Sequence, residues 1–370
     1  GVMITASHNP PQFNGIKIKT SDGGAASQSV TKKVEGYLGR AKVKSLDFNS
    51  AQGKKLIVID DLTGDYVKFI RGYLNLKKIK QANFKVLVDA MHGSGNGFMA
   101  QILKGTNIKL TLMRDKANPS FGGKRPEPVV ENLEEILRRM KSEDFDLGLV
   151  LDGDADRIAA VASGGEFIHP QKILALLAIH LFQDRGMAGG VVKTIAGTTL
   201  MDKVCDGLNL KLYETPVGFK YISELMTTKD ILVGGEEAGG MGLKNYIPER
   251  DGTLAGLLLL EMMVYRKKKI SQIVHEMEDR FGRFFYLRAD LKLKKQNPNI
   301  DKLKHLKVLA GRKVVEVKDF DGIKLICDDL SWLMFRASGT EPLMRVYSEG
   351  QTLKRSTQLI KLGERIVKGL

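Results

Sequence analysis

The chain has 370 residues, which is too long for one ordinary hydrophobic core and indicates two to four domains. Apolar residues make up 43% of it, a share typical of globular proteins that excludes an intrinsically disordered chain. The net charge of +15 comes from lysines and arginines spread over many segments. That distribution favours a field that attracts small anionic substrates over a nucleic-acid-binding patch.

No segment is typical of a membrane span or of a secretory signal. The longest apolar stretch, residues 254–265, is interrupted by Glu261 and indicates a buried helix. Cys205 and Cys327 lie far apart without metal-ligand spacing, so a reduced pair is the simpler interpretation, although a disulfide stays open. We expect a cytoplasmic monomer or homodimer with no nucleic-acid or membrane partner.

Apolar β-rich runs alternate with segments of helical periodicity up to about residue 281, which is the pattern of α/β domains. The expected strands are residues 2–5, 85–89, 147–151, 191–194 and 231–233. The expected helices are residues 28–38, 97–103, 133–141, 171–182, 219–226 and 255–265.

The last part of the chain has a different pattern, a run of short strands before a terminal helix, which predicts a separate α+β domain. The expected strands are residues 284–293, 313–319, 323–327, 332–336 and 344–348, and the helix is residues 353–367. The first domain is unusually short, because a βαβ pattern already starts near Tyr66 and an α/β domain usually needs about 100 residues. We therefore expect N-terminal sequence to be absent from it.

Four polar loops follow expected strands, at the position where α/β sheets bind ligands. The first, residues 5–11, reads TASHNPP, and its two prolines fix the chain around Ser7. His8 supplies a nearby polar group, and Lys17 follows a few residues later. Serine becomes a nucleophile only beside a base or a metal, and a proline turn with an N-capping serine is the alternative interpretation.

The second loop, residues 151–157, reads LDGDADR. Alternate residues of an extended backbone point the same way, so Asp152, Asp154 and Asp156 can converge on one cation. Oxygen ligands suit Mg²⁺, and Arg157 beside them suits a bidentate grip on a phosphoryl group. The spacing differs from that of an EF-hand, and a solvated acidic turn is the alternative.

The third loop, residues 234–240, reads GGEEAGG, and its glutamates can accept hydrogen bonds from sugar hydroxyls. Glu236 is the candidate there. Lys220 at the end of TPVGFK and Arg250 within PERDG add basic side chains on either side. A plain strand-to-helix turn is the alternative interpretation.

The fourth loop, residues 336–342, reads RASGTEP, a combination that suits a phosphate site. A structural turn is the alternative. Its candidate phosphate ligands are Arg336, Ser338, Gly339, Thr340 and Arg345. A further glycine-rich segment, residues 93–97, lacks the Gly-Lys-Ser/Thr ending of a nucleotide loop and is interpreted as a tight turn.

In this order the four loops closely resemble those of the α-D-phosphohexomutase superfamily, along the whole chain. The resemblance implies three related α/β domains, the first incomplete, and a C-terminal TATA-binding-protein-like α+β domain around a central cleft. We place them at residues 1–63, 64–166, 167–282 and 283–370. They would carry the phosphoserine, metal-binding, sugar-binding and phosphate-binding loops respectively.

The resemblance also implies the reaction. Ser7 would carry a phosphate and, with the three aspartates, hold Mg²⁺, while His8, Lys17 and Arg157 would serve catalysis. The phosphoryl group would pass between Ser7 and a hexose phosphate through glucose 1,6-bisphosphate, which is both intermediate and activator. Lys17 would transfer a proton or stabilise the moving group.

Two segments, residues 215–220 and 246–252, look more like phosphoglucomutases than phosphomannomutases or phosphoglucosamine mutases, and so favour glucose phosphates. Ala238 departs from the serine that is common in the sugar loop, and Gly240 from the histidine of several subfamilies. The glycine at residue 240 argues against the mannomutase-type pattern. Two alternatives stay open: a phosphomannomutase or phosphoglucosamine mutase, and, because of Ala238 and the short first domain, a catalytically weak sugar-phosphate-binding fragment. A metal-dependent phosphatase is a third, but it would not need a second phosphate site.

Overall fold

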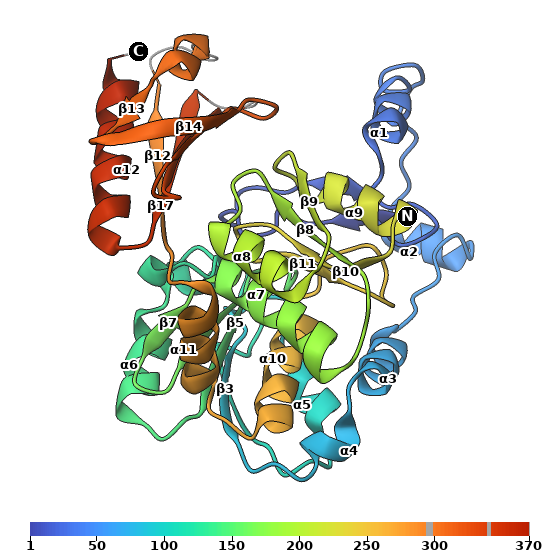
Figure 1. Cartoon of the computed structure of the whole chain (residues 1–370). Coiled ribbons are helices and arrows are strands. Elements are labelled where there is room, and N and C mark those ends of the chain that lie inside the picture. The colour runs from blue at the N-terminus through green and yellow to red at the C-terminus, as the bar shows by residue number, and fades with distance from the viewer. Residues whose placement is uncertain (294–298, 339–341, 370) are drawn as a thin grey trace.

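The computed structural model describes residues 1–293, 299–338 and 342–369. Within them the strands form four sheets, which follow one another along the chain (Figure 1). The predicted α/β class and the α+β C-terminal part are both confirmed by this arrangement. Among the described residues, none of the helices combines the length and the apolar character that crossing a membrane requires.

The N-terminal segment forms a two-stranded antiparallel ribbon followed by two short helices. Its elements are β1 (Val2–Ile4), β2 (Ile16–Ile18), α1 (Gln28–Glu35) and α2 (Phe48–Gly53). Helix α1 projects from the main body (Figure 1) and ends three residues before the predicted boundary. None of its residues is buried, so no packing extends it beyond Glu35.

The second sheet has five strands in the order β4-β3-β5-β6-β7, parallel among the first three and antiparallel after them. Its strands are β3 (Lys85–Asp89), β4 (Lys109–Met113), β5 (Leu147–Leu151), β6 (Ile158–Ala162) and β7 (Glu166–Ile168). Its helices are α3 (Thr63–Tyr73), α4 (Leu76–Ile79), α5 (Phe98–Leu103), η1 (Phe121–Gly123), η2 (Val130–Asn132) and α6 (Glu134–Ser142). All residues of β5 and β6 are buried, as expected for central strands.

The third sheet has four strands in the order β11-β10-β8-β9, with only β11 antiparallel to its neighbour. Its strands are β8 (Gly190–Thr194), β9 (Leu212–Thr215), β10 (Ile231–Gly235) and β11 (Met241–Leu243). Its helices are α7 (Pro170–Ile179), the π-helical turn η3 (His180–Asp184), α8 (Thr199–Leu208), α9 (Phe219–Thr228), α10 (Gly252–Arg266) and α11 (Ile270–Phe281).

The fourth sheet is antiparallel throughout, in the order β12-β17-β16-β15-β14-β13, and packs against the last helix. Figure 1 shows it beside the main body at upper left. Its strands are β12 (Phe285–Lys292), β13 (Val308–Leu309), β14 (Arg312–Lys318), β15 (Ile323–Cys327), β16 (Trp332–Ala337) and β17 (Leu343–Gly350). Its helices are η4 (Asp301–His305) and α12 (Leu353–Lys368).

The second and third sheets share one continuous hydrophobic core, and α10 contributes much of it. Asp251 caps this helix by accepting a hydrogen bond from the Leu254 backbone N–H (2.8 Å). The helix is apolar around most of its circumference because it packs against both β5 and β6 and against α7. The predicted domain boundary after residue 166 falls inside β7, and our four-way division stays a prediction.

A buried polar network joins α10 to η3 and to the residue that precedes α4. Glu261 in α10, which is fully buried, accepts hydrogen bonds from the Asn75 backbone N–H (2.8 Å) and shares one with His180 Nε2 (3.1 Å). The other His180 nitrogen, Nδ1, contacts Asp184 (2.9 Å). Burial alone would lower the pKa of His180, but the hydrogen bonds to Asp184 and Glu261 outweigh it and raise the pKa. Cys205 and Cys327 are both buried free cysteines.

We expect His180→Phe to lower the free energy of unfolding by about 3 kcal/mol at pH 6, because it leaves Glu261 buried with fewer partners. The folded pKa of His180 is raised, so its contribution is full below the unfolded value near 6.5 and is lost as pH rises through the folded value. Urea unfolding at pH 6 and pH 9 measures this. The exposed His275→Phe is the control, and an equal cost of His180→Phe at both pH values would contradict the assignment.

Candidate active site

The serine loop (residues 5–11) follows β1. Ser7 has a left-handed backbone (φ 55°), which costs a non-glycine residue energy and persists only where the surroundings fix it. Its N–H donates to Thr5 Oγ1 (2.9 Å), and Thr5 in turn donates to Asp154 (3.0 Å). Gly153 lies so close that a Cβ there would be 2.4 Å from the Ser7 carbonyl oxygen. The serine loop and the metal loop therefore fit together only because residue 153 has no side chain.

The Ser7 hydroxyl is surrounded by polar groups from the loop after β5 and from its own loop. It donates to Asp152 Oδ2 (3.3 Å), accepts from Arg157 Nη2 (3.2 Å), and lies 3.3 Å from His8 Nδ1. Burial and then the neighbouring Arg157 lower the pKa of His8 to about 3, so its imidazole is neutral at physiological pH. The structure thus brings Ser7, His8, Asp152 and Arg157 together.

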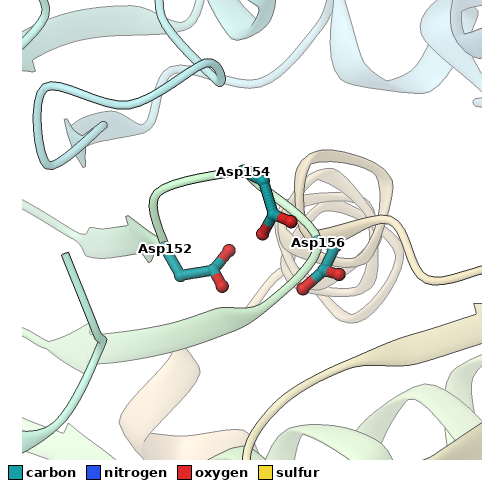
Figure 2. A group of neighbouring side chains, drawn as sticks. All are labelled: Asp152, Asp154 and Asp156. Carbon is teal, nitrogen blue, oxygen red and sulfur yellow. The ribbon is translucent and has the colours of Figure 1, made fainter. Parts of the chain in front are cut away.

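The three aspartates of the metal loop converge as the alternating spacing predicts (Figure 2). One carboxylate oxygen from each lies within 4.8 Å of the others. Asp152 is fully buried, and burial and then Asp156 raise its pKa well above the ordinary value. Among the described residues, Asp154 Oδ1 and Asp156 Oδ1 are buried without a hydrogen-bond partner. Repelling carboxylates with orphaned oxygens fit a hard divalent cation such as Mg²⁺.

Lys17 on β2 reaches the metal loop rather than the serine hydroxyl. Its Nζ donates to Asp154 Oδ2 (3.0 Å) and Asp156 Oδ2 (3.5 Å). A cavity of about 900 Å³ opens beside this cluster. It is lined by Ser7, Lys17, Asp154, Asp156 and Arg250, and by aromatic side chains that include Phe13, Tyr66, Phe98 and Phe121.

The sugar loop joins β10 to β11, and its two glutamates have different surroundings. Glu237 is buried and accepts a hydrogen bond from Thr194 Oγ1 (3.0 Å), which anchors the loop. Glu236 instead pairs with Arg250 Nη1 (3.2 Å). Burial raises the pKa of Glu236 against the opposing effect of Arg250. Glu236 is therefore the glutamate that contacts the charged side chains of the site, through Arg250.

Arg250 connects the sugar loop to the metal loop, because its Nη2 also lies 2.7 Å from Asp156 Oδ2. Its aliphatic stem lies against Gly240, where a Cβ would be 2.2 Å from Arg250 Cδ. The absence of a side chain at residue 240 thus leaves room for Arg250. Lys220 is placed differently: it is exposed, stacks over the Tyr221 ring (4.8 Å) and lines a separate cavity of about 410 Å³ with Asp22 and Gln28.

The phosphate loop follows β16. Arg336 and Arg345 are direct cross-strand partners on β16 and β17, a pairing of like charges that an anion between them would relieve. Arg345 Nε is buried and, in the described part of the chain, has no hydrogen-bond partner. Ser338 is buried, and its N–H donates to the Leu343 carbonyl (2.8 Å). The predicted ligands Gly339 and Thr340 lie outside the described residues.

Two site residues were not predicted from the sequence. Glu127 contacts both Arg157 Nη1 (3.5 Å) and His8 Nε2 (3.8 Å). It stands between two prolines in PEP, so the reasoning applied to Ser7 could have found it. Asp321 pairs with Arg336 (2.9 Å) from the turn before β15, and no sequence signal distinguishes it from other turn aspartates.

Comparisons with known proteins agree with this arrangement. Models of phosphoglucomutase/phosphomannomutase α/β/α domains I, II and III match residues 1–44, 64–165 and 169–281, and the model of the C-terminal domain matches residues 267–361. A Thermococcus kodakarensis protein described as a phosphoglucomutase/phosphomannomutase is 29% identical, with 99% of this chain and 78% of the relative covered. A Pyrococcus abyssi protein described as a probable phosphoglucosamine mutase is 30% identical over 100% of this chain and 78% of its own length.

Among solved structures, a candidate phosphomannomutase from Thermus thermophilus superimposes with a TM-score of 0.87 at 32% identity, over 100% of this chain and 78% of that one. A Paramecium phosphoglucomutase has the same fold, with a TM-score of 0.83 at 23% identity over 100% of this chain and 77% of that one. The chain therefore belongs to the phosphoglucomutase/phosphomannomutase family of phosphohexomutases, magnesium-dependent isomerases that transfer a phosphoryl group on a hexose phosphate.

Proposed function

We propose that the chain interconverts glucose 1-phosphate and glucose 6-phosphate through a phosphate carried on Ser7 and a glucose 1,6-bisphosphate intermediate. The observation that carries the proposal is the placement of the Ser7 hydroxyl between Asp152 (3.3 Å) and Arg157 (3.2 Å) at the edge of a three-aspartate cluster. A nucleophile, a cation site and a guanidinium at one point are the parts that phosphoryl transfer needs.

The residues around Ser7 would have separate roles in phosphoryl transfer. Asp152, Asp154 and Asp156 would hold Mg²⁺, which when bound neutralises charge on the phosphoryl oxygens. Arg157 stabilises the same charge from the other side. The bond from phosphorus to Ser7 Oγ breaks as the bond to a sugar hydroxyl forms, and the hydroxyl proton must leave. Lys17 is our candidate for that transfer or for stabilising the moving group.

The other two loops would hold the sugar and its second phosphate. Glu236, oriented by Arg250, accepts from sugar hydroxyls. Arg336, Arg345 and the Ser338–Thr340 segment bind the phosphate that is not reacting. The intermediate must turn around so that either phosphate can face Ser7, so these residues must accept it in both orientations. Lys220 would need to turn from its position over Tyr221 to take part.

Glucose is favoured over other hexoses by the phosphoglucomutase-like segments 215–220 and 246–252. The names of the relatives support a phosphoglucosamine mutase or a phosphomannomutase about as well. We expect kcat/KM for glucose 1-phosphate to exceed that for mannose and glucosamine 1-phosphates by roughly tenfold, because losing one hydrogen bond to the sugar costs on the order of 1 kcal/mol. A higher kcat/KM for mannose or glucosamine 1-phosphate would make that sugar phosphate the assigned substrate.

The activity is tested by ³¹P NMR of glucose 1-phosphate with the protein, Mg²⁺ and catalytic glucose 1,6-bisphosphate. The proposal predicts conversion of the 1-phosphate signal into the 6-phosphate signal at constant organic phosphate. Release of inorganic phosphate in step with substrate loss would indicate a phosphatase instead. Binding of the sugar phosphate without any conversion would indicate a sugar-phosphate-binding protein.

Gly240→Ala is expected to lower kcat/KM about 10- to 100-fold, the range for displacing a positioning group by about 1 Å. The new methyl group would push Arg250 away from Asp156 and Glu236. Gly72→Ala is a matched control, because a Cβ there meets no atom within 4 Å. Steady-state kinetics that leave Gly240→Ala equal to the control would show that the Arg250 bridge is dispensable.

A further inference from the structure

The Asp321 carboxylate contacts both the expected phosphate ligand Arg336 and a segment beside the third sheet. Asp321 lies in the turn between β14 and β15, and its two oxygens accept hydrogen bonds from Arg336 Nε (2.9 and 3.0 Å). One of these oxygens also accepts from the Val217 backbone N–H (2.7 Å). Val217 belongs to the segment between β9 and α9, on the third sheet's side of the interface.

The contact with Nε determines how Arg336 is presented. A guanidinium is planar and rigid, so fixing its Nε edge also fixes the direction of its two terminal amino groups. Arg336 is otherwise repelled by its cross-strand partner Arg345. Asp321 offsets that repulsion and removes side-chain freedom before any ligand arrives. An arginine ordered in advance binds a phosphate more tightly than one that must be ordered by it.

The rest of the interface is built separately from Asp321. Ile195 and Ala196 pack with Trp332, Met334 and Tyr347 in a buried apolar cluster. Lys324, whose Nζ lies over the Trp332 ring, also donates a hydrogen bond to the Ile195 carbonyl (2.8 Å). These contacts join the fourth sheet to the third through hydrophobic packing and the Lys324 hydrogen bond. The Asp321 side chain, which is 20% exposed, lies nearer the surface.

We propose that Asp321 is a positioning residue that aims Arg336 at the substrate phosphate and keeps it in register with the segment leading to α9. The inference rests on the proposed function, since it takes Arg336 to be a phosphate ligand. An interface ion pair without this role is the competing account. The two accounts predict opposite changes in phosphate affinity when the Asp321 charge is removed. Removing a negative charge near an anion site strengthens anion binding by electrostatics alone, whereas loss of positioning weakens it.

The test is calorimetric titration of the whole chain with glucose 1-phosphate in the absence of Mg²⁺, so that no turnover intervenes. Asp321→Asn, which removes the charge at nearly constant shape, is expected to raise Kd about tenfold, as expected for losing one ordered side chain. Asp321→Glu keeps the charge but moves the carboxylate, and is expected to weaken binding as well. If the asparagine variant does not fold, the Kd of Asp321→Glu tests the same prediction. Thermal unfolding checks that each variant is native.

Asp319→Asn is the matched control, because it makes the same charge change two residues away, where the partner is Lys304 (2.9 Å). It should leave Kd unchanged. In an Arg336→Gln background, Asp321→Asn should have no further effect, since a residue that acts through Arg336 cannot act without it.

Unchanged or tighter binding by Asp321→Asn would overturn the inference, as would an equal loss in the Arg336→Gln background. Failure of the wild-type chain to bind glucose 1-phosphate would also overturn it. Wild-type turnover is measured separately. Binding that follows the predicted pattern in a chain without mutase activity would sink the proposed function and leave the role of Asp321 standing.

Discussion

Ser7→Ala is expected to lower turnover of glucose 1-phosphate by at least roughly 10⁴-fold, the scale seen when a covalent nucleophile is removed. The variant keeps the metal loop and the phosphate loop, so it should still bind substrate with nearly the wild-type Kd. Loss of rate without loss of binding is the signature of a group that acts in the reacting step. Single-turnover assays and calorimetry measure the two quantities.

Ser21→Ala is the control, because Ser21 is an exposed serine in the same N-terminal segment. It should retain wild-type kinetics. The backbone at Ser7 is left-handed, and alanine tolerates that conformation about as poorly as serine does, so stability should change little. If Ser7→Ala kept more than a tenth of the wild-type rate, phosphoryl transfer would have to proceed through another group.

Asp152→Asn is expected to have opposite effects on stability and on function. Without metal, one carboxylate oxygen from each of the three aspartates lies within 4.8 Å of the others, and Asp152 is fully buried. Its raised pKa means that the charged form destabilises the fold near neutral pH, so a neutral asparagine should raise the unfolding free energy. Turnover should fall by ~10³-fold, because the site loses the charge that holds the cation.

Thermal unfolding with and without 10 mM Mg²⁺ separates these effects, because a cation that binds only the folded state raises the unfolding temperature. Wild-type protein should melt at higher temperature with Mg²⁺, whereas Asp152→Asn should respond little. Asp144→Asn, an exposed aspartate just before β5, is the control and should keep the wild-type Mg²⁺ response. A variant that is less stable without Mg²⁺ and still gains stability from it would contradict the metal assignment.

The strands that position the site could be predicted from the sequence because they are short, mostly apolar runs. The predicted strands at residues 85–89 and 147–151 have the same bounds as β3 and β5. Polar turns on both sides of a short apolar run mark where the strand begins and ends. The same regularity placed the three aspartates at a strand end with alternate spacing. What followed from local pattern was therefore predicted well.

Other features depend on contacts between distant segments, which a single sequence does not reveal. The pairing of Arg250 with Asp156 spans 94 positions along the chain, and the room for it comes from Gly240. Short strands such as β11, with three residues, have no periodicity of their own and exist because β10 pairs with them. Helix α10 begins three residues before the predicted residue 255 because Asp251 caps its start, and it ends one residue after the predicted residue 265.

Lys220 shows the limit of reasoning from proximity in sequence. It lies at the second position of α9, and its place upstream of the sugar loop in the sequence predicted a role beside Glu236. One helical position is a rotation of about 100°, which turns Lys220 over Tyr221 while Phe219 is buried. A helical residue's direction depends on which face packs inward, and here Phe219 takes that face.

The central claim is that Ser7 carries the phosphoryl group, and mass spectrometry tests it most directly. The protein would be incubated with glucose 1,6-bisphosphate and Mg²⁺, desalted, and measured intact and after proteolysis. The account predicts one added phosphate that maps to Ser7, is exchanged for the labelled phosphate when ¹⁸O-labelled glucose 1-phosphate is turned over, and is absent from Ser7→Ala. A phosphate that maps to another residue, or an unmodified protein that turns over substrate at the full rate, would contradict it.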